Sequence, residues 1–470
     1  MVLGISFRQL TQRICYKILG KISSIVKKPD NRKTFILTIL LYLSPFIGLL
    51  LDNLLARYFS IGVVLDTFRL TTNFMLLGTG LISGTLLKYV IIPELAHYKA
   101  EDNIRGGLVF VTVVTVLVVG LMLPLIFIGL FFPSWLLHIL GPGLEIVSGA
   151  ETLLQVASIG FSLMIITSSF SSVLQFYGIF WGQPTGQIAL NGSVLVGIVL
   201  FAGSAVTPYD QLKVLSVALG TGVAGMVGVL SFLLLSLWKK ELQTPHLTAA
   251  PQPIGVFLQK AVKGLLPQIV IVGSELLKPI IVNRTLSHLD SGSIALYSFG
   301  FKLLMLSNLP IRAITTTVFP KMSKHHAEGL SKKLLSTLHK ATFIILLLTI
   351  LIAGLLWHES DLVVKTLFGI ASLNEKDQRI LIELYQTFVF FSPFAALGLL
   401  YSEVAFASRQ ASAVMIYSII NLVLLYIALT YIGSHTEAIS VAKAYISTQG
   451  LTMSALAIVV YFRLRKLKVQ

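Results

Sequence analysis

The sequence predicts an all-α polytopic membrane protein with about 12 transmembrane helices. Hydrophobic residues make up 55% of the 470 residues and charged residues only 12%, about half the charged share of soluble domains. The apolar residues occur in continuous runs of a length that spans a bilayer, too long for the alternating strands of a membrane barrel. This composition excludes a soluble enzyme, a disulfide scaffold and a nucleic-acid-binding module, although the formal net charge is +16.

Twelve apolar segments follow one another along the chain. We expect membrane-spanning helices at Thr34–Leu55, Leu70–Ile92, Gly107–Phe132, Leu153–Phe176, Gln187–Val206, Leu212–Trp238, Val262–Val282, Ile294–Phe319, Thr342–Trp357, Ile380–Tyr401, Ala413–Ile432 and Ala438–Phe462. Residues 1–33 precede them and lack the uninterrupted apolar core of a signal peptide. Basic residues break this segment repeatedly, which predicts a cationic amphipathic segment that lies on the inner leaflet.

Lysine and arginine gather on one side of this topology. With twelve spans, the basic segment 1–33, the stretches 239–263 and 321–340, and the tail 463–470 all face the same way. Because basic loops stay in the cytoplasm, both termini are expected there. The opposite loops include 133–151, which carries few cations, and 357–379, which has mixed charge and room for a short additional helix.

The two halves of the chain resemble each other at an offset near 227 residues. Ile92–Glu101 matches Phe319–Glu328, Leu136–Leu140 matches Val363–Leu367, and 177–183 matches 403–409. Six spans per half make this a parallel repeat, a design in which the substrate sits between two lobes. The expected domains are a basic segment 1–33, a six-helix lobe 34–238, a cytoplasmic linker 239–256, a second lobe 257–463 and a basic tail 464–470.

Charged residues inside apolar spans are the best functional candidates, because each costs about 2.5–3.5 kcal/mol at the bilayer centre. The cations expected to line a cavity and bind substrate are Lys302, Arg312 and Lys88. The acids expected to serve ion coupling or gating are Asp52, Asp66, Glu275 and Glu403.

Several of these residues also have purely structural interpretations, which stay open. Asp52 can pair with Arg57 or Arg69, and Glu275 with Lys278 three residues later on the same helix. Lys88 and Lys443 lie near span ends, from which a lysine reaches the headgroups.

The sequence contains no pattern typical of catalysis. The phosphate-binding loop Gly-x-x-x-x-Gly-Lys-Ser/Thr is missing, His325 and His326 are adjacent and cannot share a helix face, and Cys15 is the only cysteine. We therefore expect no enzyme activity, no metal and no cofactor. A transporter without an ATPase motif must use the membrane potential, an ion gradient or the gradient of its own substrate.

Three stretches are similar to the MurJ/MviN family, the lipid II flippases of the multidrug/oligosaccharidyl-lipid/polysaccharide exporter superfamily. The first holds Asp52–Phe59, Asp66–Phe68 and Pro93–Lys99, and the second is Leu140–Gly143. The third runs from Asn283–Ser287 through Gly292, Tyr297 and Lys302 to Pro320–Ser323. The resemblance touches both halves in order and covers most of the chain.

The resemblance implies a V-shaped fold of two lobes around a central cavity, in a bacterial inner membrane. It also implies export of an undecaprenyl-pyrophosphate-linked peptidoglycan precursor, with cavity arginines holding the pyrophosphate. The chain departs from the family at those positions. Pro45, Leu51 and Thr79 stand where the family has arginines, Gly84 replaces a glutamate, and Lys302 replaces an arginine.

Two further hypotheses compete with a lipid-linked precursor flippase. One is a cation-coupled exporter of drugs or metabolites from the same superfamily, with acids such as Asp52, Glu275 or Glu403 in its cavity. The other is a non-transporting scaffold that recruits enzymes of cell-envelope synthesis through its basic cytoplasmic face. The expected partners are a polyprenyl-pyrophosphate-linked glycan and the bilayer.

Overall fold

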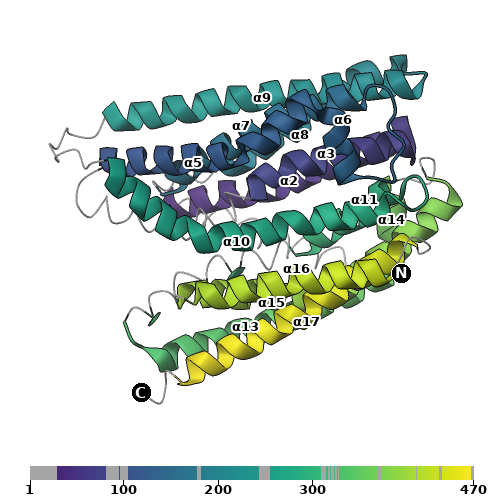
Figure 1. The fold of residues 1–470 in the computed structure, drawn as a ribbon. Coiled ribbons are helices and arrows are strands. Elements are labelled where there is room, and N and C mark those ends of the chain that lie inside the picture. The colour runs from purple at the N-terminus through teal and green to yellow at the C-terminus, as the bar shows by residue number, and fades with distance from the viewer. Residues whose placement is uncertain are drawn as a thin grey trace, which may run out of the picture.

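The computed structural model describes residues 29–80, 104–176, 182–242, 254–308, 328–368, 373–408, 410–432 and 437–466, with a few single positions between them. These residues form helices joined by short connections, without any strand. Figure 1 shows the helices running roughly alongside one another in two groups, which follow the order of the chain.

The first group packs mainly among itself. Its helices are α2 (Pro29–Phe59), α3 (Val63–Gly80), α5 (Ile104–Phe131), α6 (Pro133–Leu140), α7 (Ala150–Phe176), α8 (Gly182–Phe201) and α9 (Pro208–Leu242), with a 3-10 turn at Ala202–Ser204. We call this group the first bundle.

The second bundle likewise packs mainly among itself. Its helices are α10 (Ile254–Leu286), α11 (Ser293–Ser307), α13 (Ser331–His358), α14 (Ser360–Phe368), α15 (Glu375–Ala407), α16 (Ala411–Ile432) and α17 (Ala438–Lys466).

Several helices extend beyond the predicted limits. Helix α2 begins at Pro29 within the predicted basic segment, α9 continues to Leu242 within the predicted linker, and α17 continues to Lys466. The stretch 133–151, which was expected to be a loop, contains α6. The stretch 357–379 contains α14, the short additional helix that the sequence allowed there. Two matched segments of the predicted repeat, 136–140 and 363–367, therefore both lie on short helices.

Eight described helices are long and apolar enough to cross a membrane, which confirms a multi-pass membrane protein. They correspond to the predicted spans three to six and nine to twelve. The other four predicted spans involve α2, α3, α10 and α11. Helices α2, α3 and α10 carry buried charges. The predicted spans that include α3 and α11 also contain residues outside the described ranges. The total of twelve spans and the symmetry of the repeat stay predictions.

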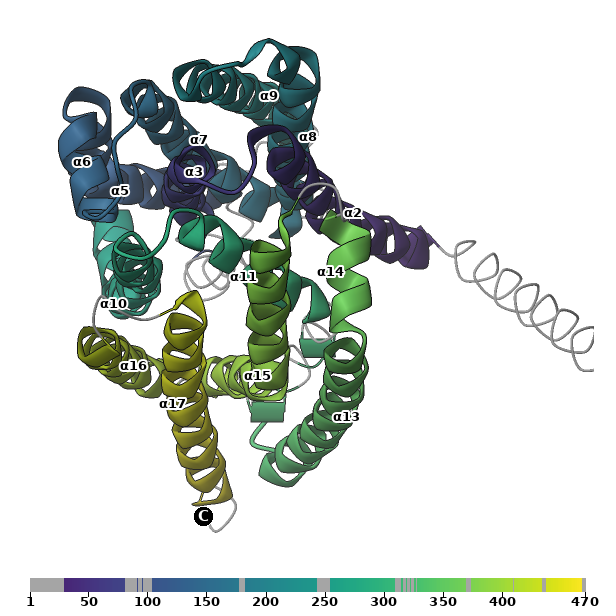
Figure 2. The same ribbon diagram turned by 90° about the vertical axis from the view of Figure 1, so that its right-hand side faces the viewer.

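The two bundles share one hydrophobic core at the end of the molecule that holds α6 and α14, which we call the α6/α14 end. A single cluster of buried apolar side chains, which also extends through the rest of the first bundle, includes Leu55 and Phe68 of the first bundle and Phe299 and Phe388 of the second. Toward the other end, the second bundle has a separate cluster around Leu338 and Val404. In the view onto this end, α3 of the first bundle lies beside α11 of the second (Figure 2).

Small residues allow α8 and α9 to pack closely. A Cβ atom added at Gly197 would lie 2.8 Å from the Cα atom of Ala218 on α9, which is too close for a real contact. A Cβ atom at Gly192, one and a half turns earlier on α8, would meet nothing within 4 Å. Glycine at 197 is therefore required by packing, as small residues often are between membrane helices.

These two glycines give a matched test of the packing. We expect Gly197→Ala to destabilise the protein by about 1–3 kcal/mol, because the new methyl group forces the helices apart. Gly192→Ala should be neutral or stabilising by up to about 1 kcal/mol, since alanine favours a helix. Thermal unfolding in detergent measures both, and equal behaviour of the two variants would contradict the packing described.

Candidate functional site

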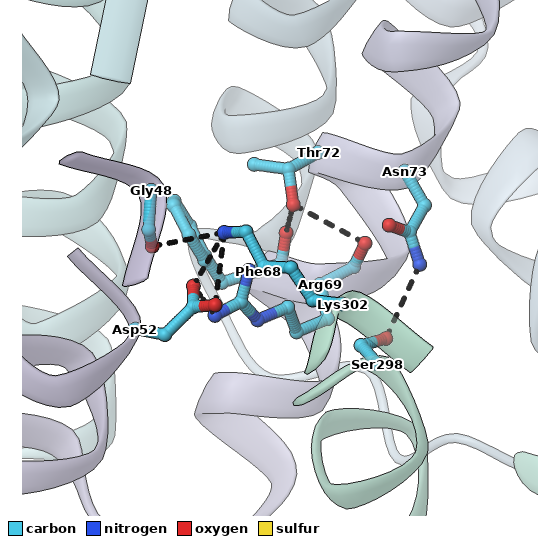
Figure 3. Close-up of polar contacts among 8 residues, drawn as sticks. All are labelled: Gly48, Asp52, Phe68, Arg69, Thr72, Asn73, Ser298 and Lys302. Carbon is cyan, nitrogen blue, oxygen red and sulfur yellow. Dashed lines mark hydrogen bonds and ion pairs between the residues drawn. The ribbon is translucent and has the colours of Figure 1, made fainter. Parts of the chain in front are cut away.

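The candidate site lies where the two bundles meet and is built around one carboxylate. Asp52 on α2 forms an ion pair with Arg69 on α3 and a second one with Lys302 on α11 of the other bundle (Figure 3). The Nζ atom of Lys302 lies 2.8 Å from Oδ2 of Asp52 and also donates to the carbonyl oxygen of Gly48 at 2.9 Å. The ion pair thus connects the bundles directly.

The three charged side chains of this cluster differ in how deeply they are buried. Asp52 is completely buried and Arg69 is 7% exposed, whereas 29% of the Lys302 side chain is accessible. A buried carboxylate must be paired to stay ionised, because its desolvation costs several kcal/mol. Two cations on one carboxylate leave one positive charge uncompensated within the cluster, and Lys302 is its accessible member.

Arg69 is held from both sides. Its guanidinium carbon lies 4.7 Å from the ring centre of Phe299 on α11, a cation–π contact that again crosses between the bundles. Its buried Nε atom has no hydrogen-bond partner among the described residues. The guanidinium therefore keeps one buried donor that Asp52 does not use.

A second carboxylate ties the bundles together closer to the α6/α14 end. Asp66 on α3 accepts hydrogen bonds from the backbone N–H groups of Gly292 at 2.6 Å and Ala295 at 2.8 Å. These groups are among the unpaired donors at the start of α11, where a negative charge is also favoured by the helix dipole. Asp66 therefore caps a helix of the opposite bundle.

The backbone around this cap is closely fitted. Gly292 has a φ of +96°, which favours glycine, and a Cβ atom there would lie 2.2 Å from the side chain of Ile61. The N–H of Gly143 donates to the hydroxyl of Ser287 at 3.2 Å, and the amide of Asn53 donates to the carbonyl oxygen of Leu367. The described contacts between the bundles thus close the α6/α14 end.

A separate polar pocket lies inside the second bundle, between α10, α15, α16 and α17. Its volume is about 160 Å³, and Glu275 and Lys278 on its wall form an ion pair of 2.6 Å. The amide of Asn421 donates to the hydroxyl of Thr452 at 2.8 Å, while its buried carbonyl oxygen has no partner among the described residues. No group of three or more metal-binding side chains gathers in the described part of the chain.

The structure brings together only some of the residues singled out in the sequence. Lys302 and Asp52 meet directly, and Asp66 lies one turn before Arg69 on the same helix. Glu275 and the buried Glu403 lie within the second bundle, away from this cluster. Lys88 and Arg312 lie outside the described residues.

Arg69 was expected only as one of two possible partners of Asp52, not as a candidate for substrate binding. The structure selects it over Arg57 and places it at the contact between the bundles. The signal in the sequence was its position one turn after Asp66 in an otherwise uncharged helix.

Comparison with known proteins relates the whole arrangement to flippases. The sequence model of the family described as "Lipid II flippase MurJ" matches residues 55–470. A solved structure of the lipid II flippase MurJ in an inward closed conformation is similar at a TM-score of 0.71 and 18% identity, over 92% of this chain and 90% of that one.

Two other solved structures share the fold at lower similarity. An inward-facing multidrug resistance transporter of the MATE family aligns at a TM-score of 0.62 and 14% identity, over 92% of this chain and 95% of that one. A transporter from Pyrococcus furiosus, whose binding pocket has reversed polarity, aligns at a TM-score of 0.60 and 16% identity, over 95% and 98%.

The cap between the bundles can be tested by stability. We expect Asp66→Ala to cost about 1–3 kcal/mol, because it leaves two buried N–H groups without their acceptor. Asp361→Ala is the control, since Asp361 pairs with Lys365 on the exposed surface of α14 and such pairs contribute at most about 1 kcal/mol. Thermal unfolding in detergent compares the two, and similar losses would contradict a special role for Asp66.

Proposed function

The chain belongs to the family of lipid II flippases named MurJ, and we propose that it exports an undecaprenyl-pyrophosphate-linked precursor of the cell envelope. The precursor would pass from the inner to the outer leaflet of a bacterial inner membrane by alternating access between the two bundles. The proposal assigns twelve spans and two cytoplasmic termini, as the distribution of basic residues indicates.

One observation carries this proposal: two cations from opposite bundles meet on a single buried carboxylate. The surplus positive charge lies in a region that is poor in water, where it attracts an anion more strongly than in bulk solvent. A pyrophosphate is the anionic part of the substrate, and it would accept hydrogen bonds from Lys302 and Arg69. Lys302 makes the first contact because its side chain is the accessible one.

The same cluster suggests how substrate would change the conformation. Asp52 and a bound pyrophosphate compete for the same two cations, so substrate weakens the ion pair between Asp52 and Lys302. Because that pair joins the bundles, its loss favours separation at the α6/α14 end, which is the outer end in the proposed orientation. A ligand shifts an equilibrium only through such a differential interaction.

Arg69 supplies a cation close to one position where this chain lacks an arginine of the family pattern. Leu51 replaces a family arginine next to Asp52 and is buried among apolar side chains. The guanidinium beside Asp52 comes instead from Arg69 on the neighbouring helix. The proposed site therefore uses Arg69 and Lys302 as its described cations, and Lys88 and Arg312 remain further candidates.

For energy coupling we propose the pocket inside the second bundle. Of the acids predicted for this role, Asp52 and Asp66 are committed to contacts between the bundles and are buried. Glu275 has a side chain that is 53% exposed and faces the pocket. A proton or another cation that reaches Glu275 would release Lys278, which lies on the helix that enters the contact between bundles.

Transport of undecaprenyl-pyrophosphate-linked sugar in proteoliposomes tests the proposed function. We expect Lys302→Ala and Arg69→Gln each to slow flipping by about tenfold or more, since a charge-assisted hydrogen bond contributes about 1.5–3 kcal/mol. Lys302→Arg should retain most of the rate, because it keeps the charge. Lys365→Ala on the exposed α14 is the matched control and should leave the rate unchanged.

Two results would contradict the proposal. Equal flipping by the native chain and the Lys302→Ala variant would exclude the cluster as the pyrophosphate site. No flipping by the native chain, with its fold confirmed by thermal unfolding, would exclude this substrate class.

A further inference from the structure

A groove on the second bundle combines two opposite charges with an apolar surface. It has a volume of about 450 Å³ and is lined by side chains of α13, α15 and α17, which lie side by side in Figure 2. The charges are Glu383 on α15 and Lys443 on α17, with Trp357 and Phe390 beside them. This groove is distinct from both the cluster around Asp52 and the pocket at Glu275.

Both charges in the groove are exposed and available. Neither Glu383 nor Lys443 forms an ion pair or a hydrogen bond with another described residue, although both line the same groove. The neighbouring Gln386 is already engaged, since its amide donates to the hydroxyl of Ser360 at 2.8 Å. Unpaired charges on membrane helices are costly unless they meet water, a partner or a headgroup.

Helix lengths place these residues near the edge of the hydrocarbon layer. Helix α15 has 33 residues and is therefore about 50 Å long, which exceeds a hydrocarbon layer of about 30 Å by about 10 Å at each end. Glu383 lies about 12 Å from the start of α15 at 1.5 Å per residue. Helix α17 has 29 residues, so by the same reasoning the hydrocarbon layer begins about 7 Å from the start of this helix. Lys443 lies at about this distance from the start of α17.

The apolar residues of the groove agree with this depth. Trp357 is the second-last residue of α13 and is half-exposed, as expected of tryptophan at a membrane interface. Phe390, two turns deeper on α15 than Glu383, is 70% exposed and faces the hydrocarbon side. The groove thus runs from a charged mouth at headgroup depth to an apolar wall at acyl-chain depth.

We propose that this groove is a binding site for phosphatidylethanolamine, a phospholipid with a phosphate and a primary ammonium. Lys443 pairs with the phosphate, Glu383 accepts hydrogen bonds from the ammonium, and an acyl chain lies along Phe390 and Ile446. Charge complementarity selects this headgroup. An anionic lipid leaves Glu383 unpaired beside a negative charge, and a choline headgroup has no N–H to donate. The site does not depend on the transport function proposed above.

Native mass spectrometry of the purified full-length chain tests this site directly. Phosphatidylethanolamine, phosphatidylcholine and phosphatidylglycerol with identical acyl chains are titrated separately. We expect phosphatidylethanolamine to bind more tightly than the other two by about tenfold or more, as one charge-assisted hydrogen bond would give. Glu383→Gln should abolish this preference, and Lys443→Gln should weaken binding of all three lipids.

Two variants outside the groove are matched controls, Glu375→Gln at the start of α15 and Lys365→Gln on α14, and neither should change lipid binding. All four positions are exposed, so the variants should unfold at the temperature of the native chain. The proposal is overturned if phosphatidylglycerol binds as tightly as phosphatidylethanolamine and depends on Lys443 alone. It is also overturned if the lipids bind equally and the groove variants behave like the controls.

Discussion

The buried carboxylate of Asp52 is the constraint on which the arrangement of the two bundles depends. A completely buried aspartate remains ionised only with cations beside it, and its own helix supplies none within the site. One cation comes from α3 of the same bundle and the other from α11 of the opposite bundle. The electrostatic requirement of a single residue therefore fixes how three helices lie relative to one another.

The remaining contacts between the bundles follow from this arrangement. With α3 and α11 adjacent, Asp66 reaches the first N–H groups of α11, and Arg69 packs against Phe299. The polar contacts lie within a shared apolar core, where they are shielded from water. The charged side chains of α2, α3 and α11 meet at the contact between the bundles. A contact made of charges can also be broken by a competing charge, which suits a transporter that must open.

Local patterns predicted much of the fold and little of the site. Long apolar runs are recognisable by length alone, and the pair Glu275–Lys278 is three residues apart on one helix. Helix α6 was missed because eight residues are too few for a periodic signal. The partners of Asp52 and Asp66 lie 250 and 226 residues away, and nothing in the local sequence specifies a contact between distant helices. For Asp52 the sequence narrowed the local partner to Arg57 or Arg69, and only packing selects Arg69.

The distance between the bundles at the α6/α14 end tests most directly whether Asp52 holds them together. Spin labels at Tyr209→Cys on α9 and Glu375→Cys on α15, in a chain carrying Cys15→Ser, report this distance by double electron–electron resonance. A single short distance is expected for the otherwise native chain. In the Asp52→Asn variant a second, longer distance should appear, because neither Arg69 nor Lys302 keeps its counter-ion. Identical distance distributions in the two proteins would contradict the central role of Asp52.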